Sequence, residues 1–278
     1  MSIIKQGYLI VVFLSLWVAP SYATDFAKEK RWANQVSEFL VDGYSHWLST
    51  DKGKFFSIYT PARTNYLNGA VILLHGRGLH PDCPQVIHPL RTRLPENGWA
   101  TLSIQLPVLA NESSDADYIP LFDDVAERVE AGLDFLAERN IEQVVLIGHS
   151  LGSSMASHYL STHQDPRIKA FVGIGMAAMP QPKSQAVLDN VVALLQVKVP
   201  VLDIYGSESV EKIMKSVDRR AYVVYHIGND KSRQVKLDGA NHLFQDHEDV
   251  LLKSITAWMD GTLKSLHHDK HASGVGTQ

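Results

Sequence analysis

Residues 144–152 read Val-Val-Leu-Ile-Gly-His-Ser-Leu-Gly and join a β-branched, apolar run to a Gly-x-Ser-x-Gly pentad. Helix-compatible residues 153–160 follow directly. This pattern predicts a strand, a sharp turn and a helix, with Ser150 held in strained backbone at the turn. Gly148 and Gly152 leave the room that such a turn needs. The hydroxyl of Ser150 would then stand exposed at the carboxyl edge of a sheet, as a nucleophile does; a chance pentad in a glycine-containing loop is the alternative.

Two backbone amides are candidates for stabilising negative charge beside Ser150. The amide of Leu151 falls in the first turn of the predicted helix, where the helix dipole favours an oxyanion. Residues 70–74 form a continuous apolar run, which is typical of a strand buried on both faces. The run ends in His-Gly-Arg-Gly, and the residue after His-Gly, Arg77, is placed to donate the second amide. A plain glycine turn leaving the strand is the other interpretation.

A candidate base follows the last predicted strand. Residues 235–237 have strand character, and residues 238–244 lead from them towards a final helix at 248–263. His242 lies in this connecting loop, where a chain of the order serine, acid, histidine places its base. His226 and His247 lack this position after a strand. We therefore assign the base to His242 and expect the other two to be ordinary surface histidines.

The motifs HGRG, GHSLG, PVLDIYG and GANH follow one another in an order that resembles that of the α/β-hydrolase superfamily. The resemblance extends over essentially the whole chain after residue 23. More narrowly, ILLHGRGLHPD with GWATLSIQLP is similar to a group of exported bacterial α/β-hydrolase-like proteins of unknown function. The resemblance implies a mostly parallel sheet of about eight strands, helices on both of its faces, and a Ser-His-acid mechanism. The short helical segment at 186–196 leaves no room for a large lid domain.

The acid of this mechanism is the point at which the sequence departs from the superfamily. The acid often lies three residues after the glycine that ends the preceding strand, and that position is Ser209 here. We assign the role to Glu208, because the predicted strand 199–205 ends just before it and its longer side chain compensates for the offset. Glu211 in the same turn is an alternative. Asp203 is a second alternative, but it lies inside the predicted strand and is expected to have a structural hydrogen-bonding role instead.

Length and composition fit one large α/β domain, which we place at residues 24–266. The chain has 278 residues, is 45% hydrophobic and 20% charged, and carries a net charge of −4. This balance gives no indication of a nucleic-acid partner or of binding to an anionic membrane surface. The single cysteine, Cys83, excludes an internal disulfide and is interpreted as a small loop residue.

The N-terminal segment 1–23 is predicted to be a signal peptide. It has a positive start at Lys5, a short apolar core and small residues before a cleavage site after Ala23. An uncleaved membrane anchor is the alternative, although the apolar run is short for a span of about 20 residues. The mature protein would be exported to the periplasm or secreted, without a stable membrane span. The polar tail 267–278 is expected to be disordered.

Together these observations predict a serine hydrolase that cleaves an ester or thioester of a small-molecule acyl substrate. Ser150 would form an acyl-enzyme, with His242 as base and Glu208 as the supporting acid, and no metal or organic cofactor is required. The Gly-x-Gly-x-x-Ala sequence at 173–178 is not a dinucleotide site, because Pro180 and Pro182 leave no helix N-terminus for a pyrophosphate. The missing acid at position 209 leaves an alternative: an impaired hydrolase fold that binds or scaffolds in the cell envelope.

Overall fold

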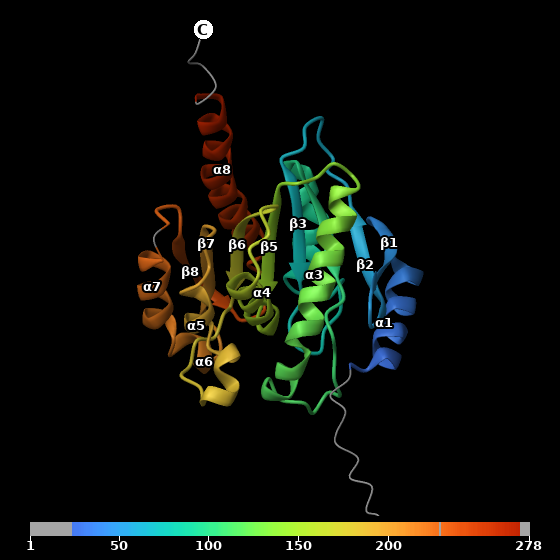
Figure 1. Cartoon of the computed structure of the whole chain (residues 1–278), viewed down its shortest axis with the longest axis horizontal. Coiled ribbons are helices and arrows are strands. Elements are labelled where there is room, and N and C mark those ends of the chain that lie inside the picture. The colour runs from blue at the N-terminus through green and yellow to red at the C-terminus, as the bar shows by residue number, and fades with distance from the viewer. Residues whose placement is uncertain (1–23, 228, 273–278) are drawn as a thin grey trace, which may run out of the picture.

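The computed structural model describes residues 24–227 and 229–272, which build one eight-stranded sheet of order β1-β2-β4-β3-β5-β6-β7-β8 (Figure 1). Strand β2 runs antiparallel to both of its neighbours, and all the other neighbouring strands are parallel. The mostly parallel sheet of about eight strands predicted from the sequence is therefore confirmed. The strands are β1 (Tyr44–Thr50), β2 (Gly53–Thr60), β3 (Gly69–Leu74), β4 (Trp99–Ile104), β5 (Val144–His149), β6 (Ile168–Ile174), β7 (Val201–Glu208) and β8 (Arg233–Asn241).

Helices cover both faces of the sheet. Apolar residues of α3, α4, α5 and α7 pack on one face, and those of α2 and α8 pack on the other. Helix α1 packs against β2 through a small cluster of its own. The α-helices are α1 (Phe26–Phe39), α2 (Ile87–Arg93), α3 (Phe122–Ala137), α4 (Leu151–Thr162), α5 (Asn190–Leu194), α6 (Glu211–Met214), α7 (Val217–His226) and α8 (Glu248–Ala272), with short 3-10 turns η1 (Leu94–Asn97), η2 (Ala116–Leu121) and η3 (Lys183–Leu188).

Strand β3 illustrates why the central strands are apolar without interruption. Successive side chains of a strand point to opposite faces of the sheet. Ile72 and Leu74 accordingly join the cluster on the α3 and α4 face, while Val71 and Leu73 join the cluster on the α2 and α8 face. Since helices cover both faces, neither set of side chains reaches solvent, and the entire strand is buried.

Two element boundaries differ from those expected from the sequence. Strand β7 continues past Gly206 to Glu208, with a register shift in its pairing to β8. Helix α8 continues to Ala272, so the part of the predicted disordered tail between residues 267 and 272 is helical.

The chain segment that connects β6 to β7 contains only the short helices η3 and α5, in agreement with the predicted lack of a large lid. None of the helices within the described residues has an apolar stretch long enough to cross a membrane. The predicted signal peptide, residues 1–23, lies outside the part of the chain that the structure describes.

A buried ion pair joins the middle of β7 to α7. Asp203 Oδ2 accepts hydrogen bonds from Arg220 Nε at 2.8 Å and from Gln234 Nε2 at 2.7 Å. The side chains of Asp203 and Arg220 are both 0% exposed. Asp203 thus has the structural role that the sequence suggested for it, because its carboxylate is bound to Arg220 and Gln234.

We predict that Asp203→Asn lowers the free energy of unfolding by about 3 kcal/mol, because it leaves the Arg220 guanidinium buried without a countercharge. Urea denaturation followed by circular dichroism measures this loss. Asp238→Asn, which breaks an exposed ion pair with Lys236, is the matched control and should change stability little. Equal stabilities of the two variants would contradict the structural role of Asp203.

Candidate active site

The turn between β5 and α4 holds Ser150 in backbone that few residues other than glycine adopt. Its φ and ψ are 54° and −122°, and its amide donates to the carbonyl of Ile174 on β6 at 2.9 Å. The two glycines of the pentad permit the turn. A Cβ on Gly152 would lie 2.3 Å from the carbonyl oxygen of His75, and one on Gly148 would lie 2.6 Å from the carbonyl oxygen of Gly152. The strand, turn and helix predicted around Ser150 are all present.

His242 follows the last residue of β8 and lies against Ser150. Its Nε2 is 3.0 Å from Ser150 Oγ, within hydrogen-bonding distance. Burial, with a smaller contribution from the nearby Lys212 and against the opposing effect of Asp115, lowers the pKa of His242 to about 4. The imidazole is therefore neutral at physiological pH, as a general base must be before it accepts a proton.

The other ring nitrogen of His242 faces a hydroxyl group. Ser209 Oγ lies 3.3 Å from His242 Nδ1, a long contact. In the tautomer that leaves Nε2 free to accept a proton from Ser150, Nδ1 donates to the serine oxygen. Glu208, to which the sequence analysis assigned the acid, has an exposed side chain instead. The reason is that β7 does not end at Gly206: Glu208 still pairs with Asn241 on β8, and the chain leaves the sheet one residue later.

The two alternative acids are engaged elsewhere. Glu211 is paired with Lys215 one turn along α6, and its side chain is 77% exposed. Asp203 is held in the buried pair with Arg220. Within the described residues, the hydrogen-bonding partner of His242 Nδ1 is therefore the hydroxyl of Ser209.

The two candidate oxyanion amides belong to Leu151, which follows Ser150 directly, and to Arg77, which lines a cavity together with Ser150. Leu151 is the first residue of α4, where a backbone N–H has no acceptor within the helix. Arg77 lies in the loop after β3, which His75 holds in place: the His75 Nδ1 contacts the carbonyl of Gly76 at 2.8 Å, and its Nε2 accepts from the Leu106 amide at 2.9 Å. Burial lowers the pKa of His75 to about 3, so that this link is made by a neutral ring.

Two further residues, to which no sequence pattern assigned a role, shape the surroundings of His242. The His149 ring packs on the His242 ring with centroids 5.0 Å apart, and its Nε2 donates to the backbone carbonyl of His242 at 3.0 Å. Gly175 has a φ of +60°, and a Cβ there would lie 2.9 Å from Cε1 of His242. His149 occupies a variable position of the pentad, and Gly175 is one of several glycines that follow strands. Their sequence positions therefore do not reveal a role, which becomes visible only from their contacts with His242 in the folded chain.

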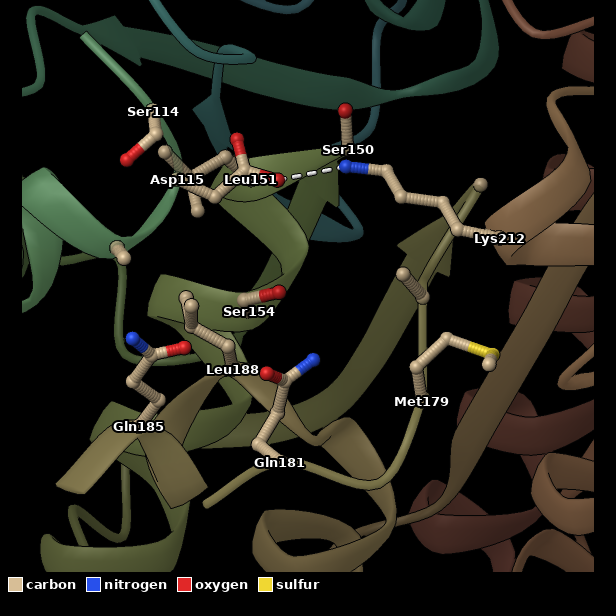
Figure 2. Close-up of a pocket in the computed structure, with 13 residues that line it drawn as sticks. Ser114, Asp115, Ser150, Leu151, Ser154, Met179, Gln181, Gln185, Leu188 and Lys212 are labelled. Atoms are coloured by element: carbon tan, nitrogen blue, oxygen red, sulfur yellow. Dashed lines mark hydrogen bonds and ion pairs between the residues drawn. The ribbon is translucent and has the colours of Figure 1, made fainter. Parts of the chain in front are cut away.

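Two adjoining cavities open on Ser150. One, of about 290 Å³, is lined by Leu151, the small and polar residues Ser114, Ser154, Gln181 and Gln185, and the apolar Met179 and Leu188 (Figure 2). The other, of about 460 Å³, is lined by His242, His149, Gly76, Arg77, Leu79, Val210 and Leu243, among others. Asp115 and Lys212 border both cavities, and their ion pair is drawn as a dashed line in Figure 2.

Cys83 and Tyr118 have structural surroundings that take no part in this chemistry. Cys83 is buried, and burial raises the pKa of its thiol to about 12, which rules out a reactive thiolate at neutral pH. Tyr118 is buried, and its hydroxyl accepts from the Leu109 amide at 2.9 Å, so it anchors the loop after β4. Among the residues that the structure describes, no group of three or more histidine, cysteine or acidic side chains is arranged to hold a metal ion.

Comparison with solved structures shows the same fold in several hydrolases. Dienelactone hydrolase from Anabaena variabilis is 21% identical, with a TM-score of 0.59 over 80% of this chain and 98% of its own. Est1E from Butyrivibrio proteoclasticus is 14% identical, with a TM-score of 0.61 over 80% and 100% of the two chains. XC6422 from Xanthomonas campestris, described as an α/β serine hydrolase without a lid, is 14% identical, with a TM-score of 0.59 over 80% and 95%.

No curated protein sequence matches this chain. One family model does match, over residues 23–119 and 119–261, and it is described as "Protein of unknown function (DUF3530)". That match spans most of the chain, including every residue of the site described above. The chain therefore belongs to the DUF3530 family, and its fold is that of the α/β hydrolases.

Proposed function

We propose that this protein is a serine hydrolase that cleaves a carboxylic ester or thioester of a small molecule. The observation that carries the proposal is the 3.0 Å contact between Ser150 Oγ and His242 Nε2 at a strained turn that exposes the serine. A serine in such a turn is an ordinary alcohol unless a base removes its proton. The neutral His242 is placed to do so.

The reaction follows from these positions. His242 Nε2 takes the hydroxyl proton as Ser150 Oγ attacks the acyl carbonyl carbon, and the amides of Leu151 and Arg77 bind the oxyanion. Each such donor typically lowers the barrier by ~3 kcal/mol. The imidazolium then gives its proton to the departing alcohol or thiol, leaving an acyl-enzyme. Water, deprotonated by the same histidine, releases the acid and restores Ser150.

Ser209 limits this reaction. A hydroxyl accepting from Nδ1 holds the imidazole in the tautomer that presents Nε2 to Ser150, but it carries no charge to offset the imidazolium. In serine proteases, losing the carboxylate at this position costs ~10⁴ in turnover. We therefore expect slow turnover with a fully formed nucleophile. The same hydroxyl favours the second candidate function, a hydrolase fold retained for binding in the cell envelope.

A fluorophosphonate probe separates these two functions, because it labels only an activated serine. We expect the wild-type protein to be labelled, and Ser150→Ala and His242→Ala each to abolish labelling while leaving the circular dichroism spectrum unchanged. Ser154→Ala, which removes a hydroxyl from the same cavity, is the matched control and should retain labelling. A wild-type protein that resists the probe would favour the binding function.

Installing a carboxylate at position 209 tests the role of His242 Nδ1. Ser209→Asp should raise turnover of a chromogenic acetate ester about tenfold or more, a part of the ~10⁴ that such a carboxylate supplies in serine proteases. It should also move the acidic limb of the pH–rate profile upward from near pH 4, because a carboxylate favours the protonated imidazole and raises its pKa.

Glu208→Gln removes the neighbouring carboxylate and serves as the control for the Ser209 variant. Since Glu208 is exposed and lies on the strand, this change should leave both turnover and the pH–rate profile as in the wild type. Loss of turnover in Glu208→Gln, together with no gain in turnover in Ser209→Asp, would show that Glu208 is the acid that supports His242.

We further propose that the protein is exported, with residues 1–23 removed. Thr24 supports a boundary here, because its side chain is already part of the fold: Oγ1 donates to Glu29 Oε1 at 2.5 Å and accepts from the Val108 amide at 2.9 Å. N-terminal sequencing of protein from the extracytoplasmic fraction should begin at Thr24. An intact Met1 on protein confined to the cytoplasm would refute export.

A further inference from the structure

The proposed reaction assigns the two cavities beside Ser150 to the two halves of an ester. His242 must deliver its proton to the departing oxygen, so the alcohol portion has to lie on the His242 side of the nucleophile. That side is the cavity of about 460 Å³, which His242 and Arg77 line. The acyl portion then occupies the cavity of about 290 Å³ that begins at Leu151. Both placements rest on the proposed hydrolase function.

Two cations in the alcohol cavity converge on one carboxylate. Arg77 Nη1 lies 3.2 Å from Asp115 Oδ1, and Lys212 Nζ lies 2.6 Å from Asp115 Oδ2. The three residues come from different parts of the chain: the loop after β3, the loop after β4, and helix α6. Their arrangement is that of a site for a carboxylate, with one oxygen bound by each cation.

The charge around this site is unbalanced. Two positive charges share the single negative charge of Asp115, which leaves one positive charge in excess. Glu211 also lines the cavity, but Lys215 neutralises it, and His242 is uncharged. The side chains of Arg77 and Lys212 are 46% and 48% exposed, so both cations keep donors that an incoming anion can reach.

We propose that Arg77 and Lys212 bind an anionic group on the alcohol portion of the substrate, and that Asp115 occupies their site when no substrate is bound. The substrate class is then an ester of a hydroxy acid, hydrolysed with its free carboxylate held by the two cations. Binding exchanges one carboxylate for another. Asp115, at 30% exposure on a surface loop, is released to water without leaving a buried charge.

A matched pair of chromogenic esters tests this assignment, 3-acetoxy-4-nitrobenzoate and 2-nitrophenyl acetate, which differ in the carboxylate on the leaving group. The quantity measured is the ratio of their kcat/KM values, each corrected for spontaneous hydrolysis. We expect the wild-type enzyme to favour the carboxylate ester. Lys212→Met and Arg77→Gln should each lower the ratio about two- to fivefold, the range for an exposed ion pair. Arg77→Gln retains the backbone amide of residue 77.

Asp115→Asn should change the ratio of kcat/KM values in the opposite direction, because it removes the carboxylate that occupies the two cations. The preference for the carboxylate ester should rise about two- to fivefold. Lys236→Met is the control for the loss of a surface lysine: Lys236 pairs with Asp238 on β8, and the ratio should stay at the wild-type value. A ratio that falls in Asp115→Asn, or that falls equally in Lys212→Met and Lys236→Met, would overturn the assignment.

Labelling with the fluorophosphonate probe distinguishes failure of the anion site from failure of the hydrolase function. If the probe labels Ser150 but turnover of both esters is too slow to measure, the anion site is tested by binding instead. The quantity measured is then how far 3-hydroxy-4-nitrobenzoate slows the labelling of Ser150. Protection that is weakened in Lys212→Met supports the anion site, and protection equal to that given by 2-nitrophenol refutes it. A protein that resists the probe altogether contradicts the hydrolase function itself.

Discussion

The close approach of the Ser150 turn to the end of β3 is the constraint on which the site depends. Gly152 lies so near the carbonyls of Leu74 and His75 that any side chain there would collide with the backbone. This contact fixes α4 against the sheet, and it also brings the loop that contains Arg77 beside the nucleophile. The positive φ of Ser150 is maintained because β5, β6 and α4 hold the residues on either side of it.

The site is built on neutral histidines and contains few charges. His75, His149 and His242 all have pKa values lowered by burial, to about 3, 3 and 4 respectively. His75 and His149 act as neutral hydrogen-bonding groups, one holding the loop of Arg77 and the other packing under the His242 ring. A cluster of this kind presents an unprotonated base over a wide pH range. In the absence of a carboxylate on Nδ1, it would do little to stabilise the imidazolium of the proposed reaction.

The charged side chains of the cleft come from loops and a short helix at the edge of the sheet. The carboxyl ends of parallel strands gather loops from distant parts of the chain at one edge of the sheet. Here they bring Arg77, Asp115 and Lys212 together in a bridge that borders both cavities. The rigid sheet and helices therefore position Ser150 and His242, the proposed nucleophile and base, while three surface residues supply the charges of the cleft. Because these three side chains are partly exposed, they can be substituted with little effect on the stability of the fold.

The sequence predicts the central sheet, the helices on both of its faces, the turn at Ser150 and the position of His242. These depend on local patterns: uninterrupted apolar runs, glycines in a pentad, and a histidine after a strand. It did not determine the partner of His242 Nδ1, because the end of β7 depends on pairing with β8, and a shift of one residue exchanges Glu208 for Ser209. The packing of Gly175 and His149 on His242, and the convergence of Arg77 and Lys212 on Asp115, join segments far apart in the chain. Only the folded sheet decides such contacts, because no local pattern records which loops meet at its edge.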